Sequence, residues 1–428
     1  MKKRVLPWIL TLLLALSLAA PAGAVETVQA EVLGVSGVCA AVVDDEGTLW
    51  TWGCNSYGQL GNDNQGDHED SYGTLYQTSP APILEEVRSV ALGDFHGAAV
   101  KEDGTLWTWG CNDNGQVGQK RVNDKDVIWY WTFIIPHRFV TPYQSVPIQI
   151  MEDVASVSAG AYFTAAVKED GTLWTWGNNY YGQLGDGHGK NQKNRIGEAC
   201  RKSPVQVMED VQAVACGDFH TLILKTDGTL WACGNNASGE LGAGDTANRD
   251  IPVQVMTDVA AISAGQSSSA ALKTDGTLWT WGDNEYGQLG TGDTRDRSEP
   301  VQVMENVAQI TFGTMHMAAI KTDGTLWTWG FDRSNQLGTG QPLAGESEMR
   351  FQSQPVQVME DAALVSAGNY TTLAAKNDGT LWAWGSDFGK FLCGLGDLED
   401  ASGDAVQSVP APLPVELTVG LPNVAAEE

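Results

Sequence analysis

One octapeptide, Asp275-Gly-Thr-Leu-Trp-Thr-Trp-Gly282, recurs along the chain and constrains its fold more than any other feature. An acidic residue and Gly followed by alternating β-forming residues are typical of a tight turn that leads into a strand. The two Trp lie two residues apart, so both point to the same face of that strand. The Gly-Thr-Leu-Trp core occurs seven times, each time after Asp or Glu, beginning at Gly47, Gly104, Gly171, Gly228, Gly276, Gly324 and Gly379. The fold must therefore offer seven equivalent places in which to bury Trp.

The fifth copy shows the repeat most clearly and predicts four short strands, at Pro252–Val255, Val259–Ala264, Ser269–Thr274 and Thr277–Trp281. Four antiparallel strands per repeat are typical of the blade of a β-propeller. We therefore predict an all-β fold in which residues 25–428 form a single seven-bladed β-propeller with one four-stranded antiparallel blade for each copy.

The end of the chain suggests how the ring closes. Pro414 to Thr418 resembles the Pro-Val strand of the other repeats and has no further copy behind it. We predict that it pairs with the blade begun by Val32 to Val43, which closes the ring and removes open strand edges. An open solenoid is the alternative, but it requires capping repeats, and nothing in the sequence resembles a cap.

Residues 1–24 predict a signal peptide. A basic start at Lys2 to Arg4 precedes an apolar run from Val5 to Ala20, and Ala22-Gly23-Ala24 is typical of a cleavage site. A retained membrane anchor is the alternative, but the small residues favour cleavage before Val25. No second apolar run could span a membrane. We expect a mature protein that is soluble, monomeric, and secreted or associated with the cell envelope.

The net charge and the cysteine pattern limit the classes of partner and of site that we expect. The formal net charge of −28 disfavours nucleic acid and anionic lipid and favours cationic partners, although solubility alone also explains it. The seven Cys contain no C-x-x-C pair, so they predict neither a zinc site nor a thioredoxin-like site. Their odd number predicts at least one thiol outside an intramolecular disulfide.

A family resemblance rests on a second repeated pattern. Ala215 to Leu224, together with the following Asp-Gly and Gly-Glu-Leu-Gly, resembles the repeat of the regulator of chromosome condensation family, and Leu92–Val100 and Phe312–Ile320 match it too. The resemblance spans residues 32–418 and implies a seven-bladed propeller. In layout the chain is also similar to exported bacterial propellers that inhibit β-lactamases, although no contact residue can be carried over. The departures are Phe163, Ser268 and Thr371 in place of His, and Cys233 in place of the second Trp.

No motif predicts catalysis, a cofactor or a metal. His96, His220 and His316 share one repeat position, and we expect each to make a hydrogen bond that fixes its turn. They come from alternate copies, too far apart for tetrahedral ligation of a metal. Nucleophile and phosphate-loop motifs are absent from the sequence. The acidic run Asp63–Asp70 lacks the spacing of a calcium loop, so we interpret it as solvated surface.

The insertion Gln119–Val146 departs most from the repeat. It carries Trp129, Tyr130, Trp131 and Phe133 close together. Trp and Tyr concentrate at binding hot spots, so this insertion is a candidate anchor for a partner. The alternative is a β-ribbon that folds onto its own blade and buries these side chains.

The alternation of strand connections between the two ends of a blade predicts which face of the propeller binds a partner. In an antiparallel meander the connections alternate between two ends, so the Gly-x-x turns and the Gly-Gln-Leu-Gly loops share one face, and the Asp-Gly and Met-Glu-Asp turns share the other. All insertions fall on the first face, and variable loops carry function more often than repeated turns. We predict that this face binds a partner through Phe95, Tyr162, Phe219, Tyr370, Tyr57, Tyr181 and Tyr286.

These features together predict an exported, non-catalytic scaffold that recognises a protein or a cell-envelope polymer. Two alternatives stay open. One is guanine-nucleotide exchange on a small GTPase, the activity of the best-known member of the family that the chain resembles; the predicted export opposes it. The other is a metal-dependent lyase with its site at the propeller axis, for which the sequence supplies no motif.

Overall fold

The computed structural model describes residues 30–35, 39–63, 66, 68–69, 75–119, 124–132, 135–187, 193–194, 197–340, 350–386 and 408–415. These residues form strands, turns and loops, and none of them belongs to a helix able to cross a membrane. The predicted signal peptide and Phe133 lie outside the described residues.

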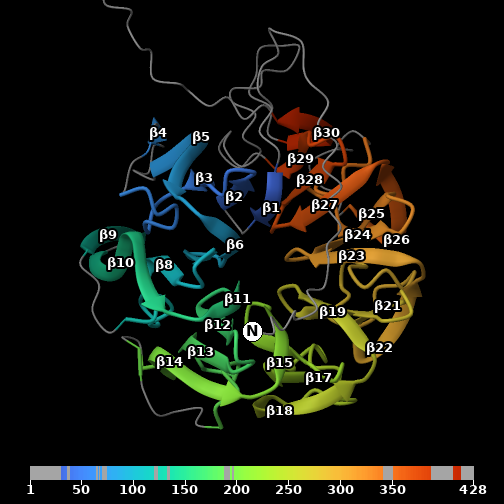
Figure 1. Cartoon of the computed structure of the whole chain (residues 1–428), viewed down its shortest axis with the longest axis horizontal. Helices are drawn as coiled ribbons and strands as arrows, with labels where there is room; N and C mark the ends of the chain where they lie inside the picture. The colour runs from blue at the N-terminus through green and yellow to red at the C-terminus, as the bar shows by residue number, and fades with distance from the viewer. Residues whose placement is uncertain are drawn as a thin grey trace, which may run out of the picture.

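Seven antiparallel sheets surround a central axis, so the predicted seven-bladed propeller is confirmed (Figure 1). In the fifth blade β19 (Val259–Ala264) is innermost, followed outward by β20 (Ser268–Lys273), β21 (Leu278–Gly282) and β22 (Arg297–Met304). The other blades are, in order, β1 (Ala30–Val35), β2 (Cys39–Asp44), β3 (Leu49–Cys54) and β5 (Leu75–Leu84); β6 (Val87–Leu92), β7 (His96–Lys101), β8 (Leu106–Cys111) and β10 (Ile135–Met151); β11 (Val154–Ala159), β12 (Phe163–Lys168), β13 (Leu173–Asn178) and β14 (Cys200–Met208); β15 (Val211–Cys216), β16 (His220–Lys225), β17 (Leu230–Gly234) and β18 (Arg249–Met256); β23 (Val307–Phe312), β24 (His316–Lys321), β25 (Leu326–Phe331) and β26 (Phe351–Met359); and β27 (Ala362–Ala367), β28 (Thr371–Lys376), β29 (Leu381–Ser386) and β30 (Ser408–Val415).

The two Trp of each octapeptide have different roles. Trp327 is half-buried and donates from Nε1 to Thr325 Oγ1 of its own turn at 2.9 Å. Trp329 is fully buried between two blades and donates from Nε1 to the backbone oxygen of Gln288 in the preceding blade at 3.0 Å. The same inter-blade hydrogen bond joins Trp109 to Gln59, Trp176 to Gln116, Trp281 to Glu240 and Trp384 to Gln336. The second Trp therefore both fills the space between blades and links their backbones.

The assignment of strands to blades differs from the sequence prediction. The Pro-Val strand is the outermost strand of the preceding copy, because β21 pairs with β22 through Trp279↔Gln302. The Gly-rich loop after β21 lies within a blade and lets the chain fold back on the same octapeptide. The turn from β22 to the next blade is short, and Asn306 occupies it with a φ of 59°.

The predicted closure by the C-terminal strand is therefore wrong. β30 pairs with β29 of its own blade, with Trp382 opposite Pro414. Since every copy already contains its own Pro-Val strand, the last one is not left over. The ring closes instead through side-chain packing, where Val42 and Trp52 of the first blade share a hydrophobic cluster with Leu373 and Trp384 of the last.

The predicted division into two faces is confirmed. Thr274 N donates to Asp258 O at 2.9 Å and Val307 N donates to Gly276 O at 3.0 Å, so the Asp-Gly turns and the inter-blade turns interlock on one face. We call this the repeated-turn face. The turns between the first and second strands and the long loops between the third and fourth strands lie on the opposite, loop-rich face.

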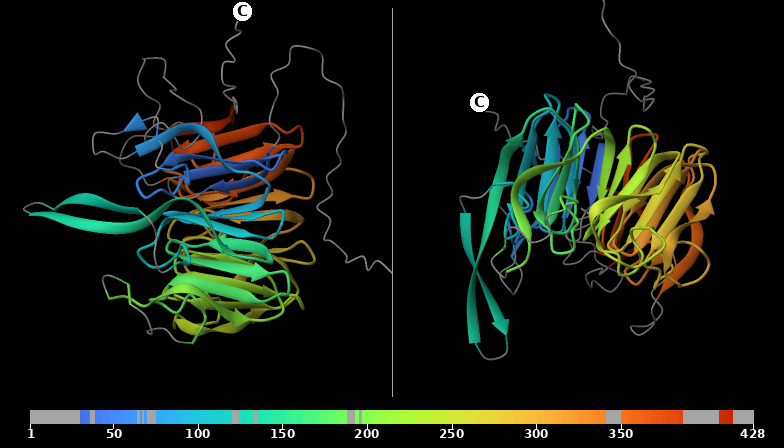
Figure 2. Two further views of the ribbon diagram at one scale, coloured as in Figure 1. Left: turned by 60° about the vertical axis from the view of Figure 1, so that its left-hand side comes forward. Right: turned by 90° about the horizontal axis from the view of Figure 1, so that it is seen from below.

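The insertion of the second blade forms a two-stranded ribbon. β9 (Asp124–Thr132) pairs with the first half of β10, with Trp131 opposite Pro136, whereas the second half of β10 pairs with β8. Tyr143 pairs with Cys111 at the end of β8, so the residues before Tyr143 continue past the loop-rich face. Figure 2 shows the ribbon projecting from the ring instead of folding onto its blade.

Candidate binding face

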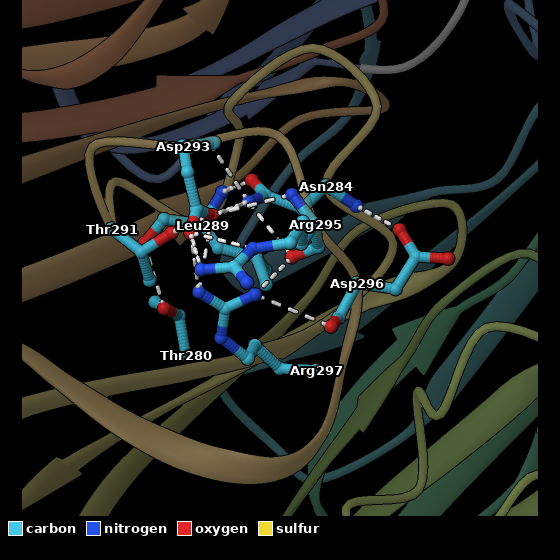
Figure 3. Close-up of polar contacts among 8 residues, drawn as sticks. All are labelled: Thr280, Asn284, Leu289, Thr291, Asp293, Arg295, Asp296 and Arg297. Atoms are coloured by element: carbon cyan, nitrogen blue, oxygen red, sulfur yellow. Dashed lines mark hydrogen bonds and ion pairs between the residues drawn. The ribbon is translucent and has the colours of Figure 1, made fainter.

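The loops of the loop-rich face are held by a buried Asn. In the fifth blade Asn284 Oδ1 accepts a hydrogen bond from Leu289 N at 3.0 Å, and its Nδ2 donates to the backbone oxygens of Asp293 and Arg295, each at 3.0 Å (Figure 3). Arg297 Nη2 binds Asp293 Oδ2 at 2.9 Å, and the hydrogen bonds from Arg297 and Arg295 lower the pKa of the Asp293 carboxyl. The Asn284 amide and the Arg297–Asp293 ion pair therefore join the two ends of the loop.

The same frame recurs around the ring. The residue at the Asn284 position accepts a backbone hydrogen bond from five residues further along in each of the other loops that the structure describes: Asn55 from Leu60, Asn112 from Val117, Asn179 from Leu184, Asn236 from Leu241 and Asp332 from Leu337. A common frame leaves the residues at the loop tips free to vary without changing the course of the backbone.

An unbroken row of aromatic rings crosses the first four blades on this face. Tyr57 meets Phe95 edge to face with centroids 5.4 Å apart, and Phe95 stacks on Tyr162 at 5.5 Å. Tyr162 stacks on Phe219 at 6.4 Å, and Tyr181 meets Phe219 at 5.3 Å. All five side chains are half-buried. We call these residues the aromatic arc; the structure thus brings five of the predicted site residues together.

The remaining predicted aromatics form a second, shorter row. Tyr286 lies 4.8 Å and Tyr370 lies 6.4 Å from Phe331, measured between ring centroids. Sequence reasoning missed Phe331, because it follows Trp-Gly at a position that Cys, Asn, Asp or Ser fills in other copies. It also missed Tyr180, which is 58% exposed and packs against Tyr181 at 4.8 Å. Adjacency to the predicted Tyr181 was the only signal for Tyr180.

The ribbon residues lie apart from both rows. Trp129, Tyr130 and Trp131 occupy β9, opposite Arg138, His137 and Pro136 on β10. Their role in binding stays a prediction.

A small cavity opens at the axis of the loop-rich face. It has a volume of about 100 Å³ and is lined by the turns between the first and second strands of the second to seventh blades. Its polar lining comprises Asp94, Asp218, Gln266, Thr314 and Asn369. Burial and the negative charge of Asp94 raise the pKa of Asp218 to about 7, and burial raises the pKa of Asp94. Two carboxyl groups from blades that are not adjacent therefore meet at the axis.

The three repeated histidines bond a neighbouring blade, so the prediction that each fixes its own turn is wrong. His96 Nε2 lies 2.8 Å from Thr164 Oγ1. The Thr164 hydroxyl donates its proton to Gln116 O at 2.9 Å, so it accepts from His96, and the ring carries its proton on Nε2. His220 and His316 bond Ser269 and Thr372 in the same way.

Burial keeps these rings neutral. It lowers the pKa of His96 and His316 to about 3 and that of His220 to about 4. Among the described residues, no group of three or more His, Cys, Asp or Glu could hold a metal ion. The run Asp63–Asp70 lies mostly outside these residues, so its interpretation stays a prediction.

Known proteins share this repeat and this fold. A model of the RCC1-like domain matches residues 17–344, and models of the regulator of chromosome condensation (RCC1) repeat match residues 323–375 and 363–389. The ultraviolet-B receptor UVR8 of Arabidopsis thaliana is 32% identical over 203 residues, which are 46% of this chain and 39% of UVR8. The RCC2 homolog of Danio rerio is 32% identical over 236 residues, 49% of this chain and 42% of that protein. The chain thus spans less than half the length of these curated relatives.

Solved structures agree on the fold. The crystal structure of Kap60 bound to yeast RCC1 (Prp20) matches with a TM-score of 0.69 at 20% identity, over 96% of this chain and 92% of the other. Human WBSCR16 matches with a TM-score of 0.66 at 22% identity, over 86% and 93%. At these identities the likeness concerns the propeller itself.

Proposed function

The chain belongs to the RCC1-like domain family, and on this premise we propose that it is an exported, non-catalytic scaffold that binds a protein partner through its loop-rich face. Members of this family include protein binders: yeast RCC1 (Prp20) was solved bound to Kap60, and a further study of Prp20p describes its binding to Gsp1p and histones. A cell-envelope polymer is the alternative occupant of the same face.

The aromatic arc carries this proposal. Its five half-exposed rings form one continuous surface across four blades, contributed by turns and loops that hydrogen bonds hold in place. Rigid aromatic side chains bury much area at little cost in conformational entropy and dominate binding hot spots. The repeated-turn face, in contrast, carries near-identical polar turns.

Export is supported by the charge pattern at the start of the chain. The sequence Lys2 to Ala24 has the basic, apolar and small-residue parts of a signal peptide. N-terminal sequencing of the protein recovered from culture medium and envelope fractions tests this; a mature chain that begins at Val25 is expected, and an uncut chain confined to the cytosol would refute it.

The binding proposal is tested by capturing partners from medium and envelope extract with the mature protein. A Phe95→Ala/Phe219→Ala variant should lose the captured partner, because loss of a hot-spot ring costs about 2 kcal/mol or more, about 30-fold in Kd. Ile251→Ala is the matched control, because this side chain is 61% exposed on the outer strand β18. A Trp129→Ala/Trp131→Ala variant tests the ribbon separately.

The results of the capture experiment distinguish the candidate functions from one another. Equal capture by the wild type and the Phe95→Ala/Phe219→Ala variant, with unchanged thermal stability, would contradict the role of the arc. Capture of a glycan in place of a protein would identify the polymer alternative. Capture of a small GTPase whose nucleotide release the protein accelerates would replace the scaffold with the exchange-factor alternative.

A further inference from the structure

The axial cavity has an excess of hydrogen-bond acceptors. Asp94 and Asp218 supply carboxylate oxygens, and Asp218 pairs with the Gln266 side chain. Thr314 donates its hydroxyl proton to Asn369 Oδ1 and so has none left for a ligand. No Lys or Arg is present among the residues that line the cavity. Among the described residues that line the cavity, none therefore offers a cationic side chain to the two like charges of Asp94 and Asp218.

The wall behind the cavity adds further acceptors. Gly93, Gly217 and Gly313 line the cavity, and a Cβ placed on them would lie 2.7, 2.5 and 2.8 Å from Nδ1 of His96, His220 and His316. Each of these Nδ1 atoms is buried and has no hydrogen-bond partner among the described residues. Because the rings carry their protons on Nε2, each Nδ1 presents a lone pair directly behind a glycine of the wall.

Acceptors that have lost water without gaining donors are costly. A cation that donates hydrogen bonds and lies between Asp94 and Asp218 would offset the repulsion between the two carboxylates, and its positive charge would also be favoured by the imidazole lone pairs behind the wall. A metal ion is disfavoured, because the described residues contain no group of three or more ligands of the His, Cys, Asp and Glu type. The surroundings favour an organic cation, because Phe95 and Phe219 directly follow Asp94 and Asp218 and stack with Tyr162.

We propose that the axial cavity receives one basic side chain, a lysine or an arginine, that the protein partner inserts between Asp94 and Asp218. The inference rests on the proposed function, because it names the chemical group that the same partner presents. The aromatic arc then buries the partner's surface around this group, and the carboxylate pair determines where along the partner the propeller docks. Complementary charges across an interface contribute to specificity and to the rate of association more than to affinity.

The free mature protein can be tested without its partner. The probes are the capped tripeptide amides Gly-Lys-Gly and Gly-Arg-Gly, and Gly-norleucine-Gly as the neutral control, each titrated by calorimetry at pH 8. At least one basic probe should bind saturably at one site, and norleucine should bind at least tenfold more weakly. Asp94→Asn and Asp218→Asn should each weaken binding at least tenfold. Asp227→Asn is the matched control, because it removes an exposed carboxylate from the repeated-turn face of the same blade as Asp218.

The pH dependence adds an independent readout. Besides Asp94 and Asp218, the lining contains one titratable group, Cys216, and burial raises the pKa of this thiol to about 12. The three histidines behind the wall have pKa values of about 3 to 4 and stay neutral. Because the pKa of Asp218 is raised to about 7, its ionised fraction, and with it the affinity, should fall about tenfold between pH 8 and pH 6.

Three results would overturn the proposal: no saturable binding of either basic probe, equal binding of norleucine, or binding that both Asp→Asn variants leave unchanged. Displacement of a bound basic probe by micromolar Ca²⁺ or Mn²⁺ would assign the cavity to a metal instead. Any of these results leaves the scaffold proposal standing if the aromatic variants still lose the partner, so the two failures are distinguishable. Thermal melts of both Asp→Asn variants establish that they fold.

Discussion

Glu240 offers a sharp test of how the loops are built. It lies in the fourth blade at a position that is Gln in the other described loops, and it is 1% exposed. Its carboxylate accepts hydrogen bonds from Asn235 Nδ2 and from Ser238 N. Burial raises the pKa of Glu240 above its ordinary value of 4.5. The wild type thus holds a buried carboxylate where an amide would fit, so Glu240→Gln should stabilise the propeller.

The third blade shows what the variant will look like. Gln183 accepts from Tyr181 N at 3.0 Å through Oε1 and donates from Nε2 to Asn178 Oδ1 at 2.9 Å. Asn235 is the counterpart of Asn178, and a rotation of its amide would present Oδ1 to the side-chain amide that the substitution introduces. The number of hydrogen bonds is kept while the buried charge is removed, which we expect to raise the free energy of unfolding by about 1–2 kcal/mol at pH 8.

The sign of the pH dependence follows from the raised pKa. The folded state holds a proton on Glu240 to a higher pH than the unfolded chain does, so this group costs the wild type stability as pH rises above 4.5. In urea unfolding, Glu240→Gln should therefore have a higher free energy of unfolding than the wild type at pH 8 and an equal one at pH 4. Gln183→Glu, the reverse change in the matching loop, should lower stability at pH 8. An equal gain at both pH values, or a loss at pH 8, would refute this account of Glu240.

Three further predictions concern the core. Chemical denaturation of Trp329→Ala should show a free energy of unfolding lower by about 3–5 kcal/mol, because this side chain is fully buried. Trp327→Ala should cost less than half of that, because Trp327 is only half-buried. Stability should fall as pH drops from 6.5 towards 3, because burial lowers the pKa of His316 to about 3 and the folded state therefore binds fewer protons than the unfolded chain. Between pH 7 and pH 5 the wild type should lose about 2 kcal/mol more of its free energy of unfolding than His316→Thr, as unfolding curves at the two pH values would show. At pH 8 a thiol reagent should label Cys111 and Cys233 only after unfolding, because both side chains are buried and burial raises both pKa values; fast labelling of either in the native protein would contradict the packing.

The sequence by itself determined the number of blades, the strand content of each repeat and the two-faced layout. These properties depend on local signals. Asp275-Gly276 specifies a turn, the two-residue spacing of Trp279 and Trp281 specifies a face of a strand, and the parity of connections assigns each turn to one end. Seven copies of one pattern make such local rules reinforce one another, so the count and the loop-rich face could be read without coordinates.

Only the tertiary structure decided where a blade begins and what meets at its centre. Pairing a Pro-Val strand with the octapeptide before it or with the apolar strand after it satisfies the same period-two pattern. The choice depends on long-range backbone hydrogen bonds such as those between β29 and β30, which local preferences do not encode. The axial cavity arises in the same way: Asp94 and Asp218 are far apart in sequence, and only the closure of the ring turns two ordinary turn residues into one half-buried pair of like charges.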